Sequence, residues 1–162
     1  MSVEIERKFL LGAEPDWSAL AGSAVGRIEF EQVYLRVTEV EEKRIRRRTG
    51  NGLTSYEYAH LRTLRPGVRM VDEVGVDRAE YERLRADRDD SRQVVRKIRR
   101  TFHWTGRLYE VDHILEPARR TCWLLEVQVD REDDAVLLPE FLPVLREVTG
   151  EPLFRNAHIA LG

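Results

Sequence analysis

Charged and apolar residues alternate along most of the chain, and this pattern restricts the fold more than any other feature of the sequence. In residues 3–9, an extended segment would carry Glu4, Glu6 and Lys8 on one face and mostly apolar side chains on the other. Because successive side chains of a β-strand point to opposite faces, a period of two predicts strands. We predict strands over residues 3–9, 29–37, 42–48, 55–62, 68–76, 92–104, 108–115 and 123–130.

Turn and capping signals connect these strands. Asn51-Gly52 is a two-residue hairpin signal, and Pro66-Gly67 is a second turn. Asp77 is placed to cap a helix at its N-terminus. We predict helices over residues 77–88, over 133–148 with interruptions at two prolines, and over 155–161. About eight strands without a strand–helix–strand rhythm predict an α+β fold with an antiparallel sheet.

Composition limits the partners. The 162 residues suit one domain, 1–162, and 35% of them are charged, yet 27 Lys and Arg offset 29 Asp and Glu. A generic nucleic-acid binder would be clearly basic, so no nucleic-acid partner is expected. The chain has one cysteine and neither a signal-peptide pattern nor an apolar run of membrane-spanning length. We expect a soluble, cytoplasmic protein without a membrane partner; a homodimer stays open.

The two signs of charge are segregated between strands. Acidic or amide side chains share a face at Glu4 and Glu6, at Glu110 and Asp112, and at Glu126, Gln128 and Asp130. Basic side chains share a face at Arg44, Arg46 and Arg48, and at Lys97 and Arg99. An ordinary solvated sheet face does not need this segregation. If the sheet closes into a barrel, the rows would line one lumen, where carboxylates suit Mg²⁺ or Mn²⁺ and guanidinium groups suit phosphate.

Several short motifs follow one another in an order that resembles a known family. Glu4-Ile5-Glu6-Arg7-Lys8 resembles the E-x-E-x-K pattern of the CYTH superfamily. That group, also called triphosphate tunnel metalloenzymes, includes inorganic triphosphatases, thiamine triphosphatases and class IV adenylyl cyclases. Further motifs that match the family's order are Arg44-Ile45-Arg46, Lys97-Ile98-Arg99, Leu108 to Asp112, Leu125 to Gln128, and Arg155-Asn156. The resemblance covers nearly the whole chain.

The resemblance implies a closed eight-stranded antiparallel β-barrel, a tunnel with flanking helices, that binds a triphosphate or another polyanion with Mg²⁺ or Mn²⁺. The implied metal ligands are Glu4, Glu6, Glu126, Asp112 and Gln128. The implied phosphate-binding residues are Lys8, Arg44, Arg46, Arg62, Lys97, Arg99 and Arg155. We take Lys97 as a catalytic candidate and Glu73 or Glu110 as candidates for the general base, which no motif identifies.

Two departures from the family's pattern leave alternatives. Val71 stands where the second acidic pair would place a carboxylate, and Gln128 replaces a carboxylate of the later pair. The leading interpretation is a metal-dependent phosphohydrolase acting on tripolyphosphate or another triphosphate. The alternative is a non-catalytic tunnel module that binds a phosphorylated or polyanionic ligand. Cyclisation of ATP is a third, although no residue pattern marks a pocket for the base.

Overall fold

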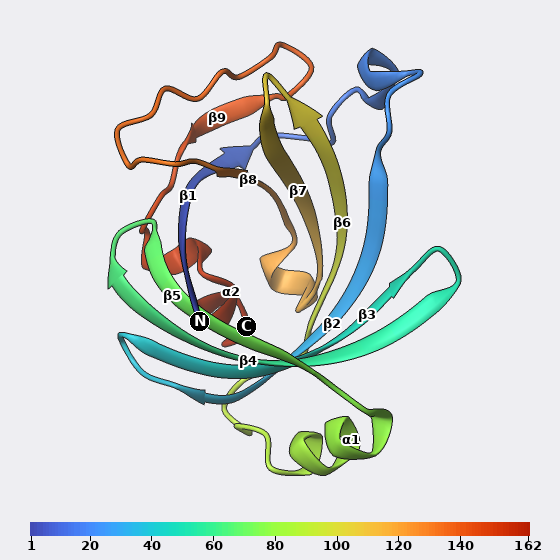
Figure 1. Cartoon of the computed structure of the whole chain (residues 1–162), viewed down its shortest axis with the longest axis vertical. Coiled ribbons are helices and arrows are strands. Elements are labelled where there is room, and N and C mark those ends of the chain that lie inside the picture. Colours follow the sequence, from blue (N-terminus) through green and yellow to red (C-terminus); the bar gives the residue numbers. More distant parts are fainter.

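The computed structural model describes residues 1–162 as one large sheet with short helices (Figure 1). The strands are β1 (Ser2–Leu11), β2 (Gly26–Val37), β3 (Glu41–Gly50), β4 (Leu53–Arg65), β5 (Val68–Val76), β6 (Val95–Trp104), β7 (Arg107–Glu116), β8 (Cys122–Gln128) and β9 (Val144–Glu147). The α-helices are α1 (Arg78–Ala86) and α2 (Asn156–Ile159), and the 3-10 helices are η1 (Trp17–Leu20), η2 (Ala118–Arg120) and η3 (Pro152–Phe154).

The first eight strands close into an antiparallel barrel, as predicted. The sheet order is β5-β4-β3-β2-β6-β7-β8-β1-β9, and a further pairing between β5 and β1 closes the ring (Figure 1). β9 pairs with β1 beyond the point where β5 leaves it. The predicted hairpin between β3 and β4 turns at Asn51 and Gly52, both of which have positive φ. Every strand predicted from the alternation is present, with boundaries shifted by a few residues.

The predicted helix that follows Asp77 is confirmed, whereas a second predicted helix is absent. The side chain of Asp77 accepts a hydrogen bond from the Glu80 amide and caps α1, as predicted. The helix predicted over residues 133–148 is wrong, because residues 129–143 form an irregular strap that leads into β9. Pro139 and Pro143 cannot donate backbone hydrogen bonds within a helix. The Asp134 and Leu142 amides donate to carbonyls three residues earlier, and residues 144–147 pair with the edge of β1 instead.

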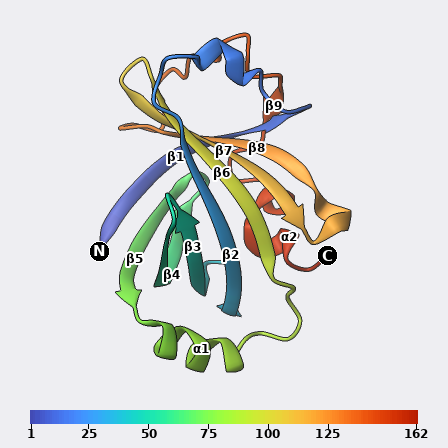
Figure 2. The same ribbon diagram turned by 90° about the vertical axis from the view of Figure 1, so that its right-hand side faces the viewer.

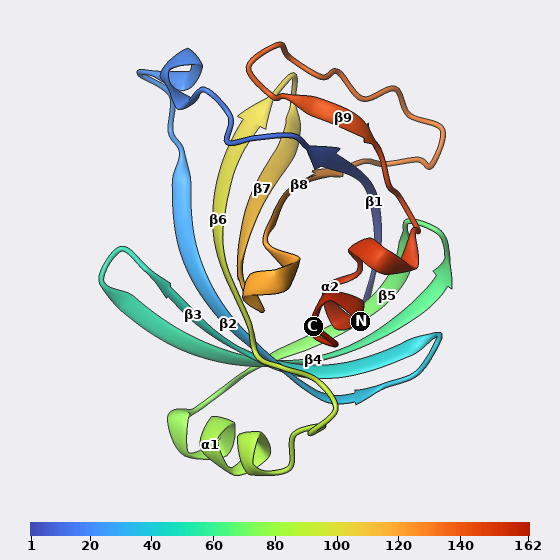
Figure 3. The same ribbon diagram turned by 180° about the vertical axis from the view of Figure 1, so that it is seen from behind.

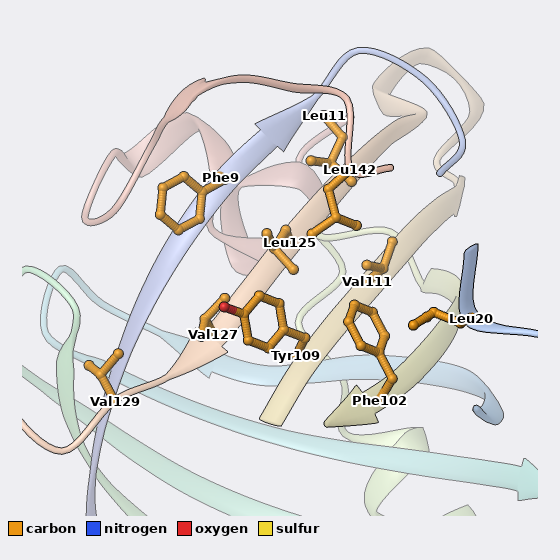
Figure 4. Close-up of a cluster of buried hydrophobic side chains, with 10 residues drawn as sticks. All are labelled: Phe9, Leu11, Leu20, Phe102, Tyr109, Val111, Leu125, Val127, Val129 and Leu142. Carbon is orange, nitrogen blue, oxygen red and sulfur yellow. The ribbon is translucent and has the colours of Figure 1, made fainter. Parts of the chain in front are cut away.

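The largest apolar core lies outside the barrel rather than inside it. Ten buried side chains pack between the outer faces of β1, β6, β7 and β8 and the segments that cross them (Figure 4). The cluster comprises Phe9, Leu11, Leu20, Phe102, Tyr109, Val111, Leu125, Val127, Val129 and Leu142. The Tyr109 hydroxyl donates to the Leu137 carbonyl at 2.6 Å, which ties the strap to the barrel wall. Burial on this face lets the opposite faces of the same strands be polar.

Helix α1 covers a second part of the outer wall. Its Tyr81 is buried against Val33 of β2 and Ile45 of β3, and its ring lies 4.9 Å from that of Tyr56. Figure 2 shows α1 on the side of the barrel away from β9. Neither this helix nor any other combines the length and apolar character needed to cross a membrane.

One end of the barrel is filled by apolar side chains. Tyr34, Val95, Ile114 and Leu124 share a strand face with the charged rows, and they pack against α2 through Ile159 and its neighbours. Figure 3 shows α2 and the C-terminus lying across this end of the ring. The inner wall is therefore apolar at one end and charged along the remainder, which confines the polar space to the rest of the lumen.

Candidate functional site

A cavity of about 640 Å³ occupies the charged part of the barrel. Its basic lining residues are Lys8, Arg44, Arg46, Arg48, Arg65, Arg69, Lys97, Arg99 and Arg155. Its acidic lining residues are Glu4, Glu6, Glu39, Glu42, Glu73, Glu110 and Glu126. Nine formal positive charges thus face seven negative ones, whereas the whole chain carries a net charge of −2. The surface of the cavity is therefore slightly basic, which favours an anionic ligand.

Twelve of the fourteen residues predicted to form the site line this cavity. They are Glu4, Glu6, Lys8, Arg44, Arg46, Glu73, Lys97, Arg99, Glu110, Glu126, Gln128 and Arg155. Val71, which replaces an expected carboxylate, also lines it. The strand alternation therefore places these side chains in one space, although they come from six strands and the C-terminal segment.

Arg62 is the first exception. Its side chain is exposed, whereas its neighbours Leu61 and Thr63 line the cavity. Since adjacent residues of a strand point to opposite faces, Arg62 lies on the outside of β4. Its predicted place among the phosphate-binding residues is wrong.

Asp112 is the second exception, because it lies deeper than the cavity lining. Its carboxylate accepts hydrogen bonds from Lys97 at 2.8 Å and from two nitrogens of Arg99 at 2.6 and 2.8 Å. Burial alone would raise the pKa of Asp112, but the charges of Arg99 and Lys97 outweigh burial and lower it. Asp112 holds two basic side chains in position, so its oxygens are not free to ligate a metal as predicted.

The β3 wall supplies two buried guanidinium groups that line the cavity, those of Arg44 and Arg46. Arg46 binds Glu57 and also donates to Glu73 at 2.9 Å, and its guanidinium lies 4.8 Å from the centre of the Phe30 ring. Burial, with the nearby positive charge of Arg44, lowers the pKa of Arg46 to about 10. Arg44 donates to Glu42 at 3.1 Å, while its buried Nε has no hydrogen-bond partner. A buried donor without a partner is destabilising, which an incoming oxygen would relieve.

Lys97 is the most deeply buried cation of the lining, with 3% of its surface exposed. Besides Asp112, its ammonium donates to the side chain of Asn156 in α2 at 3.1 Å. Burial lowers the pKa of Lys97 to about 8 despite the neighbouring Asp112. Lys97 therefore changes charge close to neutral pH, unlike the arginines around it.

The acidic wall is formed by β1 and β8. Burial raises the pKa of Glu6, and the negative charge of Glu126 raises it further. Burial would also raise the pKa of Glu126, but Lys8 and Arg99 hold it well below its usual range. The Lys8 ammonium lies 3.3 Å from the Glu126 carboxylate, and the Gln128 amide donates to Glu6 at 3.4 Å. The pKa values of these two neighbouring carboxylates are thus shifted in opposite directions.

Arg69 is a lining residue that the motif comparison missed. It faces Glu4 directly across the β1–β5 pairing, and its guanidinium reaches both Glu4 and Glu6. Arg69, Val71 and Glu73 share one face of β5, so strand alternation alone could have found it. In this arrangement no group of three or more His, Cys, Asp or Glu side chains is close enough together to hold a metal ion.

Solved structures of known proteins share this architecture. The chain is 28% identical to the inorganic triphosphatase NE1496, over 98% of both chains, with a TM-score of 0.62. HpAC1 from Hippeastrum, a candidate adenylyl cyclase described as having a dominant triphosphatase activity, matches at 15% identity over 81% of this chain and 80% of its own, with a TM-score of 0.58. A candidate adenylate cyclase from Bacillus halodurans matches at 14% identity over 82% and 84%, with a TM-score of 0.57.

No protein-family model matches the chain, and no curated protein matches it in sequence. The structural neighbours nevertheless include CYTH-fold proteins with triphosphatase and adenylyl cyclase names. The resemblance inferred from the short motifs is confirmed at the level of the fold.

Proposed function

We propose that this chain, which has the CYTH tunnel fold, is a hydrolase that cleaves a phosphoanhydride bond of tripolyphosphate or another triphosphate. The observation that carries the proposal is the lumen, where nine basic side chains outnumber seven carboxylates within about 640 Å³. A compact polyanion is the ligand class that neutralises such a wall most completely. The similarity to the inorganic triphosphatase NE1496 over nearly the full length supports the same reaction class.

The β3 arginines are the first phosphate ligands in this proposal. Arg44 has an unpartnered Nε, and neither it nor Arg46 has all its N–H groups bound to carboxylates. Guanidinium groups bind phosphate oxygens through two parallel hydrogen bonds, so this wall fixes the orientation of the chain of phosphates. Lys8, Lys97 and Arg155 add positive charge around the same cavity. Arg99 contributes less, because it is already bound to Asp112, Glu110 and Glu126.

The acidic wall offers the oxygen ligands that a divalent cation prefers. Glu4, Glu6 and Gln128 line the cavity with oxygen-bearing side chains, and burial together with the charge of Glu126 raises the pKa of Glu6, so a cation beside Glu6 would stabilise its anion. We expect these three residues and Glu126 to hold Mg²⁺ or Mn²⁺ when a triphosphate is bound. The cation would polarise the phosphoryl group and favour attack by water. Arg44 and Arg46 stabilise the charge that develops on the phosphate oxygens.

Glu110 is the better of the two candidate bases. Burial raises its pKa, and it lines the cavity while accepting a hydrogen bond from Arg99 at 2.7 Å. A carboxylate with a raised pKa removes a proton from water more readily than an ordinary one. Glu73 also lines the cavity but is exposed and paired with Arg46. Glu110→Gln should therefore lower turnover more than Glu73→Gln.

Phosphate release from tripolyphosphate, ATP and thiamine triphosphate, each with Mg²⁺, with Mn²⁺ and with a chelator, tests the proposal. We expect release from at least one of these substrates, dependent on the cation and on Arg44 and Arg46. Arg62→Ala is the matched control, since Arg62 carries the same charge on the outside of the barrel. Absence of release from all three substrates would refute hydrolysis.

A non-catalytic polyanion-binding module is the second candidate, and the lining of the cavity favours it in one respect. Val71 and Gln128 place an apolar and a neutral side chain where carboxylates were expected, which reduces the negative charge available to a cation. Binding of tripolyphosphate by calorimetry without phosphate release would support this candidate. Formation of a cyclic nucleotide from ATP would instead support a cyclase.

A further inference from the structure

Arg69 places a positive charge among the carboxylates of the acidic wall. The antiparallel register of β1 and β5 sets it directly opposite Glu4. Its Nε and Nη2 each lie 3.3 Å from one Glu4 oxygen, and Nη2 lies 3.8 Å from a Glu6 oxygen. Because the register of the sheet fixes this position, the guanidinium does not depend on a mobile loop for its placement.

The surroundings keep Arg69 charged. Burial would lower its pKa, but Glu6, Glu126 and Glu4 hold the pKa above its usual value. Glu42 is a further negative charge near Arg69. The Arg69 side chain is 27% exposed and lines the cavity, so its guanidinium is within reach of a ligand there. Arg69 is thus a permanent cation with carboxylates on one side and the cavity on the other.

A guanidinium and a divalent cation compete for these carboxylates. Mg²⁺ requires oxygen ligands at about 2.1 Å in a nearly octahedral arrangement. One Glu4 oxygen already accepts from both Nε and Nη2 of Arg69, and a divalent cation on the same carboxylate would be repelled by the guanidinium. Phosphate, by contrast, is a good partner for an arginine fork.

We infer that Arg69 is a built-in counter-cation, which excludes a divalent metal from Glu4 and Glu6 until a polyanion draws its guanidinium onto phosphate. The inference rests on the proposed function, since it assumes that the lumen binds a triphosphate. It assigns Arg69 two opposite effects: it weakens metal binding to the protein alone, and it strengthens anion binding in the absence of metal. A residue that only maintains the fold would not act in opposite directions.

Calorimetry with Mn²⁺ and ligand-free protein tests the first effect. Arg69→Gln should bind Mn²⁺ on the order of tenfold more tightly than wild type, because a repelling charge is removed and two carboxylates are released. Arg69→Lys keeps the charge and should stay within about threefold of wild type. Arg48→Gln removes a lining charge that contacts neither Glu4 nor Glu6, and it should gain much less.

Titration of tripolyphosphate in the presence of a chelator tests the second effect. Arg69→Gln should bind the anion on the order of tenfold more weakly than wild type, since one phosphate partner is lost. Equal Mn²⁺ affinity in Arg69→Gln and wild type would overturn the inference, as would an equal gain in Arg69→Lys. Unchanged anion affinity in Arg69→Gln would overturn it too. If Arg69→Gln does not fold, Arg69→Met carries the same expectations.

The two proposals can fail separately. If the wild type neither binds nor hydrolyses tripolyphosphate, the proposed function fails, and the Mn²⁺ titrations still decide whether Arg69 excludes the cation. If tripolyphosphate is hydrolysed but Arg69→Gln has the Mn²⁺ affinity of wild type, the function stands and the inference about Arg69 is refuted.

Discussion

The outer and inner faces of β7 and β8 differ in what they contribute. On β7, Tyr109 and Val111 point outward into the apolar cluster, whereas Glu110 and Asp112 point inward. Burying apolar side chains stabilises the fold, but gathering charges in a shielded lumen is at best neutral for stability. The outer faces of these strands thus stabilise the fold, whereas their inner faces form the binding site. Substitutions on the two faces should therefore have separable effects.

Phe102→Ala should give the largest effect, and it should be on stability. The ring is 2% exposed and packs against Tyr109 at 5.4 Å between ring centres. Removing such a side chain leaves a cavity and should lower the free energy of unfolding by about 3–5 kcal/mol. Urea unfolding measures this loss. Leu53→Ala, at the exposed start of β4, is the control and should change little. A loss below about 1 kcal/mol would show that the outer cluster is not the main core.

The double variant Arg44→Ala and Arg46→Ala should give the largest effect on binding. It removes two of the three guanidinium groups that β3 contributes to the cavity lining. Tripolyphosphate should raise the melting temperature of wild type, since a ligand that binds only the folded state stabilises it by mass action. The double variant should lose that shift, which corresponds to an affinity loss of about 100-fold or more. Arg62→Ala should keep the shift, and an undiminished shift in the double variant would exclude this wall from the site.

Gln128→Glu should give a smaller effect, on metal binding alone. Gln128 lies within hydrogen-bonding distance of Glu6, so a carboxylate there adds negative charge beside it. Mn²⁺ affinity of the ligand-free protein should rise about tenfold by calorimetry. Gln93→Glu makes the same change away from the cavity and should leave the affinity unaltered. Equal Mn²⁺ affinity in Gln128→Glu and wild type would show that Gln128 is not close to the metal.

Strand alternation predicted the strands and the face that each side chain occupies, whereas closure into a barrel was implied by the family resemblance. The order of the motifs places Arg62 in the site, whereas strand alternation puts Leu61 inside the barrel and Arg62 outside, as the structure does. Arg69 was missed for the related reason that no motif contained it, although it shares a face with Val71. Alternation carries more information about the lumen than the motifs do.

Other features depend on packing that a sequence pattern does not specify. Asp112 points inward as expected, but its depth along the barrel depends on the register of β6 and β7, which pairs it with Arg99. The segment 133–148 was predicted to be a helix interrupted by two prolines. Its residues Phe141 and Leu142 pack onto the outer cluster in an irregular conformation instead. That outcome follows from the prolines and from an available β1 edge, which only the closed barrel creates.

The smallest expected effect is a pH dependence that separates Lys97 from the arginines of the same lumen. Its pKa of about 8, lowered by burial, means that Lys97 loses its charge as pH rises through 8. In the unfolded chain the pKa is higher, so this residue makes the protein more stable as pH rises above 8. The same loss of charge weakens anion binding, because the neutral amine of Lys97 no longer attracts phosphate.

Between pH 7 and 9.5 the affinity of wild type for tripolyphosphate, measured with a chelator, should therefore fall several-fold relative to that of Lys97→Arg. Arginine stays charged over this range, and the ionisation of the ligand affects both proteins equally. The comparison thus isolates the side chain at position 97. If the affinities of the two proteins depend on pH in the same way, either Lys97 does not contact the anion or Asp112 and Asn156 keep it protonated throughout. A lumen in which the arginines alone bind the phosphates would then replace the one proposed.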